Sequence, residues 1–245
     1  KAEILGILVL LSDVTKQREL DRLKAETVQL VSHELRAPLT SIQGLSDVLR
    51  KFPVSTEESQ EMLATIHSEA IRLNELINRF LDIKRLESGG QNLQISTVNL
   101  NELLENCVQT ANPFALEKET KIQLIKNEKP LTIQADAQLL KQTIDNLLNN
   151  AIKYSPPRSN IEIKSVKTQN EAQIIVKDNG YGIPQESLSR IFDNFYRLER
   201  DVLSETIGTG LGLAFVKGVV EKHGGRVTVE SQEGVGSIFV LSLES

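Results

Sequence analysis

Cysteine is almost absent from this chain of 245 residues, and basic residues are not in excess. The single cysteine, Cys107, excludes an internal disulfide framework and suits a reducing compartment. No group of cysteines and histidines has the spacing of metal ligands. Because 28 lysines and arginines are outnumbered by 33 acidic residues, the net charge is -5, and we expect no nucleic acid as a partner.

The sequence also lacks a hydrophobic run long enough to cross a membrane. The longest one near its start, Ile4 to Leu11, is far shorter than the ~20 residues that a spanning helix needs. No signal peptide is visible either. We therefore expect this part of the protein to be cytoplasmic, and any membrane anchor to lie upstream of Lys1.

The composition that remains is that of a soluble globular protein, with 40% hydrophobic and 25% charged residues and length enough for two domains. Ile4 to Leu11 is short and apolar and is followed by Ser-Asp, which predicts a buried strand. The pattern then becomes helical. One broad and mostly apolar face, with steps of three and four residues, carries Leu20, Leu23, Thr27, Leu30, Val31, Glu34, Pro38, Ile42, Leu45 and Leu49.

A second helix follows after a break at residues 52–55. Ser55 or Thr56, together with Glu58, predicts its N-cap. Its apolar stripe runs from Met62 to Phe80, and the helix is expected to end near residues 88–90. Since a two-helix hairpin cannot cover both stripes, the pattern predicts a dimer with a four-helix bundle.

After Gly90 short β-rich stretches alternate with helical ones, which predicts an α+β domain with helices over one sheet. The expected helices are 100–110, 137–154 and 213–222. The expected strands are 122–125, 131–134, 161–166, 173–177, 226–231 and 237–243. We place the domain boundary near Gly89-Gly90.

His33 is the first candidate for chemistry. It is expected to face outward, roughly 130° from the centre of the apolar stripe. A neutral imidazole is a competent nucleophile, and the neighbouring Glu34 can hold the proton on its other nitrogen. Pro38 should kink the helix one turn later. A surface histidine without a function is the alternative that this segment leaves open.

A polar face is expected on the helix of residues 137–154. Asn146, Asn150, Lys153 and Tyr154 stand at i, i+4, i+7 and i+8. Two amide oxygens and a lysine can hold a hydrated Mg²⁺ and phosphate oxygens, and the tyrosine can lie against a purine. A polar surface stripe is the alternative.

Two glycine-containing segments complete the set. Asp178 stands at the end of a strand, where it can accept a hydrogen bond from the amine of adenine, and Gly180, Gly182 and Ile183 follow it. An ordinary turn is the alternative. Residues 208–213, Gly-Thr-Gly-Leu-Gly-Leu, precede an apolar helix, where free amides can bind an anion. They match neither the P-loop nor the dinucleotide fingerprint.

Taken together and in this order, these segments resemble the boxes of sensor histidine kinases. The segments are His33 to Leu39 (H box), Asp145 to Ser155 (N box), Asp178 to Gly182 (first glycine box), Phe192 to Arg197 (F box) and Gly208 to Gly212 (second glycine box). The resemblance covers roughly residues 20–243. Ile4 to Thr15 is similar to the last strand of a PAS sensor domain. The resemblance thus implies a PAS-like end at 1–15, a signalling helix and dimerisation/phosphotransfer domain at 16–89, and an α/β-sandwich ATP-binding domain at 90–245.

The resemblance also implies the roles of single residues. His33 would accept the phosphoryl group, Glu34 would be its general base, and Asn150 would bind Mg²⁺ with support from Asn146. Lys153 and Arg197 would meet phosphates, Tyr154 would stack on adenine, and residues 200–209 would form the ATP lid. The nucleotide-binding residues are then Asn146, Asn150, Lys153, Tyr154, Asp178, Gly180, Gly182, Ile183, Arg197, Gly208, Thr209, Gly210, Leu211 and Gly212. The phosphoryl group would pass to an aspartate of a response regulator receiver domain.

The sequence departs from the family at Ala37. Many relatives carry threonine or asparagine there, which helps to place water for dephosphorylating the regulator, so phosphatase activity is in doubt. Two other classes share the ATP fold or its ligand. An ATPase would need an acid where Asn146 stands, and a non-catalytic scaffold would have no use for His33, Glu34 and Asn150.

Overall fold

The computed structural model describes residues 15–87, 93–127, 129–198 and 210–244, and the side chains at 15–28, 30, 33 and 87 lie outside the description. The expected strand at residues 4–11 and the expected boundary at Gly89-Gly90 also lie outside it. The chain divides into two compact units, residues 1–73 and 74–245.

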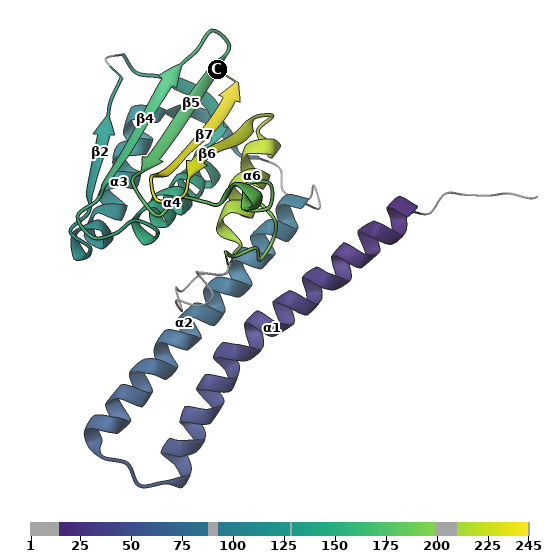
Figure 1. The fold of residues 1–245 in the computed structure, drawn as a ribbon, viewed down its shortest axis with the longest axis vertical. Coiled ribbons are helices and arrows are strands. Elements are labelled where there is room, and N and C mark those ends of the chain that lie inside the picture. Colours follow the sequence, from purple (N-terminus) through teal and green to yellow (C-terminus); the bar gives the residue numbers. More distant parts are fainter. Residues whose placement is uncertain (1–14, 88–92, 128, 199–209, 245) are drawn as a thin grey trace, which may run out of the picture. The chain divides into compact units, whose positions relative to one another are not determined.

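The first unit is helical. It holds α1 (Thr15–Lys51) and the first part of α2 (Thr56–Glu87), joined by a short loop (Figure 1). Ser55 is the N-cap residue of α2, because its Oγ accepts from Glu58 N at 3.2 Å while the Glu58 carboxylate accepts from Ser55 N at 2.9 Å. This reciprocal pair confirms the expected cap. Within the described ranges, no helix combines the length and the apolar character that crossing a bilayer requires.

The second unit contains a five-stranded sheet in the order β2-β4-β5-β7-β6 (Figure 1). Its strands are β2 (Lys121–Ile125), β4 (Asn160–Lys167), β5 (Glu171–Asp178), β6 (Arg226–Gln232) and β7 (Gly236–Glu244). The pair β2–β4 is parallel, and every other pair of this sheet is antiparallel. A short 3₁₀ helix occupies Gln185–Ser187.

The expectation of one sheet was wrong. β1 (Ile95–Asn99) and β3 (Thr132–Asp136) form a separate antiparallel two-stranded sheet. Of the two strands only β3 was expected. β1 is largely exposed, with Val98 as its one buried side chain, so it carries no alternating apolar signal.

Three helices cover one face of the large sheet: α3 (Leu100–Glu117), α4 (Ala137–Lys153) and α6 (Gly212–Lys222). The strands show which face is covered, because burial alternates along β4 and β5, with Ile161, Ile163, Ile174 and Val176 almost fully buried. Burying each such side chain contributes roughly 1.5–3 kcal/mol, so this layer holds the domain together. Asp178, the last residue of β5, is buried on the same side.

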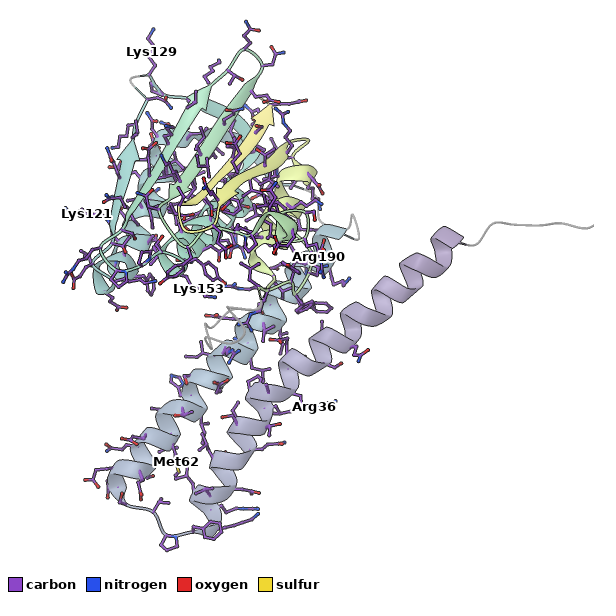
Figure 2. The ribbon with its side chains drawn as sticks, viewed as in Figure 1. Arg36, Met62, Lys121, Lys129, Lys153 and Arg190 are labelled. Carbon is purple, nitrogen blue, oxygen red and sulfur yellow. The ribbon has the colours of Figure 1, made fainter. Side chains whose placement is uncertain are left out.

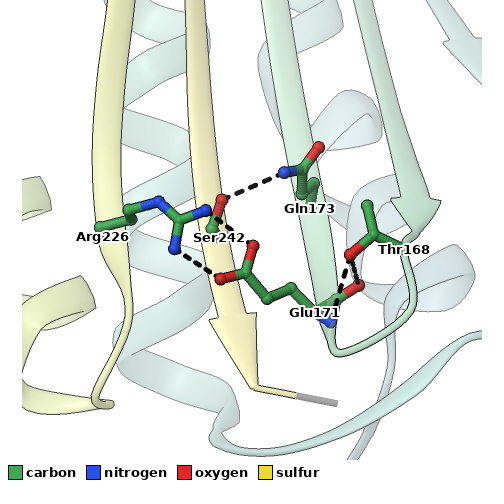
Figure 3. Close-up of polar contacts among 5 residues, drawn as sticks. All are labelled: Thr168, Glu171, Gln173, Arg226 and Ser242. Atoms are coloured by element: carbon green, nitrogen blue, oxygen red, sulfur yellow. Dashed lines mark hydrogen bonds and ion pairs between the residues drawn. The ribbon is translucent and has the colours of Figure 1, made fainter.

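A row of polar side-chain contacts connects three strands at the end of the sheet that is far from Asp178 (Figure 3). Glu171 on β5 binds Arg226 on β6 across β7, with the second of two contacts at 2.9 Å. Between them, Gln173 Nε2 donates to Ser242 Oγ on β7 at 3.3 Å. Arg226 is 61% exposed, so the pair contributes at most about 1 kcal/mol. The row connects three neighbouring strands, whose register is given by their backbone pairing.

Candidate functional site

A cavity of about 290 Å³ opens beside α4 in the second unit. Residues from α2, α4, the loop after β5, residues 191–198, the start of α6 and β7 line it together. The sequence-predicted residues in its wall are Asn146, Asn150, Lys153, Tyr154, Asp178, Gly182, Ile183, Arg197, Gly210 and Gly212. Segments that are far apart in the chain thus meet at one hollow.

The remaining predicted residues are placed differently. Gly180 and Leu211 do not line the cavity: both are buried, and Leu211 is only 1% exposed. Gly208 and Thr209, with the rest of the expected lid, lie outside the described residues. His33 is part of α1, but its side chain is likewise not described, so the expected outward orientation stays a prediction. Glu34 is half-buried on the same helix.

The helix α4 is held at both ends. At its start the Asp136 carboxylate caps it, because Oδ1 accepts from Gln138 N and Leu139 N, both at 3.1 Å. At its end Lys118 Nζ donates to the carbonyl oxygens of Ile152 at 2.9 Å and Lys153 at 2.7 Å. These carbonyls have no partner within the helix, so a cation suits them. Partial burial lowers the pKa of Lys118.

The face of α4 that meets the cavity is polar, and its opposite face is core. Leu140, Ile144 and Leu147 are at most 1% exposed and pack in the helix layer. This amphipathic pattern turns Asn146 and Asn150 toward the cavity. Lys153 (labelled in Figure 2) ends the helix, and its Nζ lies 4.7 Å from the centre of the Tyr154 ring.

The loop after β5 is bonded directly to the end of α4. Tyr181 N donates to Tyr154 O at 2.9 Å. A Cβ at Gly180 would collide with that same carbonyl, so only glycine allows the approach. Gly182 has a φ of +66°, which also favours glycine, and a Cβ there would collide with the backbone of Gln232. Gly180 therefore positions the loop against the end of α4 without lining the cavity itself.

Asp178 is the buried carboxylate of the cavity, at 7% exposure. Its Oδ1 accepts from Gly180 N at 2.8 Å and from Ser237 N at 3.2 Å. Burial raises the pKa of Asp178, and these two backbone donors act in the opposite direction. The carboxylate is thus fixed in orientation by one oxygen.

The segment of residues 191–198 forms a further wall, and sequence reasoning assigned only Arg197 in it. Tyr196 also lines the cavity, and its hydroxyl is 3.0 Å from Ser187 Oγ, to which it donates. The Arg190 guanidinium (Figure 2) lies 4.6 Å from the centre of the Tyr196 ring. Phe195 N donates to Gly210 O at 3.0 Å, which joins this wall to the start of α6.

Other lining residues were missed altogether. They are Arg79, Asn149, Ala151, Ile191, Leu198, Leu213, Ser237 and Phe239. Tyr196 could have been found, since it stands inside the segment from Phe192 to Arg197 that carried a resemblance. The apolar members, Ala151, Ile191, Leu198, Leu213 and Phe239, give the cavity an apolar surface in addition to its polar one.

The cavity as a whole suits a ligand with one flat apolar part and one anionic part. Asp178 presents a hydrogen-bond acceptor, and Lys153 and Arg197 present positive charge. The described residues contain no group of three or more histidine, cysteine, aspartate or glutamate side chains that could hold a metal by themselves. The oxygen donors beside the cationic part are instead the amides of Asn146 and Asn150, which suit a hydrated hard cation.

Two family models match the chain. Residues 10–89 match the His Kinase A (phospho-acceptor) domain. Residues 135–245 match the histidine kinase-, DNA gyrase B-, and HSP90-like ATPase family. The second match contains every residue of the cavity wall except Arg79, and the first contains Arg79 and His33.

Proteins that are similar to this chain in sequence or structure support these two matches. The alginate biosynthesis sensor protein KinB of Pseudomonas aeruginosa is 34% identical over 241 residues, which are 97% of this chain and 40% of KinB. Full-length ShkA, solved in complex with AMPPNP, is 26% identical with a TM-score of 0.68, over 91% of this chain and 45% of ShkA. Histidine kinase ThkA, solved in complex with the response regulator protein TrrA, shares the fold at a TM-score of 0.72 and 24% identity, over 95% of this chain and 65% of that one.

The chain spans about 40% of the length of KinB, so the relatives contain more than is seen here. The part that is shared nevertheless includes both a phospho-acceptor domain and an ATPase domain of the histidine kinase type, in that order. The helical hairpin followed by an α/β sandwich is the fold that these proteins share. This chain therefore belongs to the sensor histidine kinases.

Proposed function

We propose that this chain binds ATP with Mg²⁺ in the cavity beside α4 and transfers the γ-phosphoryl group to His33. The observation that carries the proposal is the meeting of Asp178 with the polar face of α4 around one cavity, in a chain that also has a phospho-acceptor domain. A nucleoside triphosphate requires a hydrogen-bond acceptor for its base and hydrogen-bond donors for its phosphates, and this cavity offers both.

Asp178 is proposed to recognise adenine. Its Oδ1 is already bonded to two backbone N–H groups, so Oδ2 is the oxygen that would accept from the 6-amino group. The Tyr154 ring would lie against the base, and the apolar wall around Ile183 and Phe239 would cover the other side.

The phosphates are proposed to lie along the polar face of α4. Lys153 and Arg197 would contact phosphate oxygens, since both line the cavity and carry positive charge. The Asn150 amide oxygen would bind Mg²⁺, with Asn146 supporting the site. A Cβ on Gly212 would lie only 3.5 Å from Asn146 Oδ1, so this amide faces the start of α6 and its first backbone N–H groups. The metal ion would neutralise the charge of the phosphates.

The transfer itself needs little beyond positioning. An imidazole nitrogen of His33 attacks the γ-phosphorus in line, the new N–P bond forms, and the bond to the bridging oxygen breaks to release ADP. Glu34 would hold the proton on the other ring nitrogen and so stabilise the positive charge that the ring gains. The phosphoryl group would then pass to an aspartate on a receiver domain.

The phospho-acceptor domain supports a response regulator as the partner, because ThkA, a histidine kinase of similar fold, was solved in complex with the response regulator protein TrrA. A homodimer is proposed for the same domain. Large apolar side chains of the hairpin are 40–54% exposed, namely Leu39, Leu63 and Ile71 in the first unit and Ile77 at the start of the second. A dimeric bundle would cover them.

Water activation by an acid of α4, as in an ATPase, has less support. Asp145 is the only acidic residue of this helix. Its Oδ2 pairs with Lys141 Nζ at 2.6 Å, and it does not line the cavity. An acid turned away from the nucleotide cannot serve as the base that ATP hydrolysis requires.

The test is labelling with γ-³²P-ATP and Mg²⁺. The label should be acid-labile and alkali-stable, and His33→Gln should abolish it while leaving nucleotide affinity within about twofold. His67→Gln, an exposed histidine of α2, is the matched control and should label normally. Label that survives in His33→Gln, or that is acid-stable, would refute phosphorylation of His33.

A further inference from the structure

One serine hydroxyl outside the cavity is bonded to three groups, two of which belong to residues of the cavity wall. Ser231, near the end of β6, has its Oγ 2.8 Å from Ile183 N, 2.8 Å from Gly236 O and 2.9 Å from Ser237 Oγ. A hydroxyl has one proton and two lone pairs, so these contacts have only one consistent assignment. Ser231 donates to Gly236 O and accepts from Ile183 N and from the Ser237 hydroxyl.

The groups held by Ser231 are parts of the proposed base-binding wall. Ile183 and Ser237 both line the cavity, whereas Ser231 does not. Ser237 N in turn donates to Asp178 Oδ1 at 3.2 Å. Register explains this sequence of contacts, because Asp178 is opposite Ser237 on β7, and Ser237 is opposite Ser231 on β6. Three neighbouring strands thus present three polar side chains in one row.

The backbone also connects the β6–β7 hairpin to the loop after β5. Gly234 N, in the turn between β6 and β7, donates to Tyr181 O at 2.8 Å. Two side chains bond to both the loop after β5 and the start of β7: the Asp178 carboxylate and, from outside the cavity, the Ser231 hydroxyl. Without it, Ile183 N and Gly236 O would each lose a partner in a partly buried place, and both segments could shift.

We propose that Ser231 is a positioning residue that sets the base preference of the site. It holds Ser237 and Ile183, and through Ser237 it fixes the orientation of the Asp178 carboxylate. The inference rests on the proposed function, in which Asp178 accepts from the 6-amino group of adenine. Hydrogen bonds to the base discriminate between ligands only when the acceptor is held in place. In the proposed function the phosphates and Mg²⁺ would lie along α4, whose residues do not belong to this row.

The experiment compares ATP with purine riboside triphosphate, which is ATP without the 6-amino group. KM and kcat for autophosphorylation are measured with both nucleotides in the intact chain. The native protein should prefer ATP in KM by about 10- to 100-fold, the effect of one hydrogen bond to a charged group. Ser231→Ala should narrow that preference by about three- to tenfold, with kcat at saturating ATP within about twofold of native.

Two further variants separate positioning from a general loss of stability. Ser231→Thr keeps the hydroxyl and should retain the native preference. Ser242→Ala removes a buried hydroxyl from β7 at the opposite end of the sheet, where its partner is Gln173 (Figure 3), and should leave the preference unchanged. Thermal unfolding of both alanine variants shows whether their stabilities are comparable.

The outcomes distinguish the inference from the function on which it rests. If Ser231→Ala keeps the full preference for ATP, or if Ser231→Thr behaves as Ser231→Ala, the inference is wrong although the function stands. An equal narrowing in Ser242→Ala would also overturn it, since stability alone would then be the cause. If the native chain shows no preference between the two nucleotides, the proposed role of Asp178 itself fails.

Discussion

Replacing Asp178 with asparagine separates the chemistry of this residue from its structural role. Asparagine keeps the carbonyl oxygen that accepts from Gly180 N and Ser237 N, so the loop can retain its shape. The change replaces the other oxygen with an NH₂ group, which is a donor and cannot accept from the adenine amine. Losing a hydrogen bond to a charged acceptor costs about 1.5–3 kcal/mol, so ATP affinity should fall about 10- to 100-fold.

The stability of the same variant should change in the opposite direction. Burial raises the pKa of Asp178 in the folded state above its unfolded value. Between these two values the native state binds more protons than the unfolded state, so stability decreases as pH rises through this window and stays lower above it. The asparagine side chain carries no charge and avoids that loss, so Asp178→Asn should be at least as stable as the native chain at pH 7.5.

The assay pairs isothermal titration with ATP and Mg²⁺ with thermal unfolding at several pH values from 4 to 8. The matched control is Glu230→Gln, which removes an exposed carboxylate from β6 and should change neither quantity. Native-like ATP affinity in Asp178→Asn would refute the base contact. A clear loss of stability at pH 7.5 that is absent at pH 4 would refute the sign of the charge effect.

Three more predictions concern other parts of the chain. Lys118→Met should cost about 1–2 kcal/mol in urea unfolding and weaken ATP binding, because two carbonyls at the end of α4 lose their donor, whereas exposed Lys121→Met should do neither. Burial, with the negative charge of Asp145, raises the pKa of Cys107 to about 12, so this thiol should resist Ellman's reagent at pH 8 and react only in guanidinium; rapid labelling of the native chain would contradict its burial. Ala37, an exposed residue of α1, cannot orient water, so Ala37→Thr should raise the rate at which the kinase dephosphorylates its regulator by about tenfold or more, and equal rates would rule this out.

The strongly periodic elements could be predicted from the sequence, and the errors have identifiable causes. The helix expected at residues 100–110 continues to Glu117, because Ala111 and Ala115 bury their side chains on either side of Pro113. The stabilisation from burying these side chains outweighs the loss of the backbone hydrogen bond that proline cannot donate. β1 was missed because it is an edge-like strand whose residues are mostly exposed. Its pairing with β3 depends on residues 33 or more positions away, which no local pattern reports.

Only part of the cavity could be predicted, again because a local pattern does not report contacts between distant elements. The face of α4 was visible as a helical spacing, and Asp178 as an acid after a strand, so both were found. Ser237 and Phe239 belong to β7, where buried residues line either the core or the cavity and look alike in sequence. A pattern within one element indicates which side is buried, but only the packing of distant elements indicates where that side leaves a hollow.

The position of β7 in the sheet governs how the ATP-binding unit can fold during synthesis. β7 lies between β5 and β6, although its residues 236–244 follow both strands in the chain. Until those residues leave the ribosome, β5 and β6 each present an unpaired edge, and most of the sheet's long-range pairs cannot form. A nascent chain that stalls at Gln232 would therefore expose two aggregation-prone edges at once. A chaperone that shields strand edges would therefore matter most before residues 236–244 have left the ribosome.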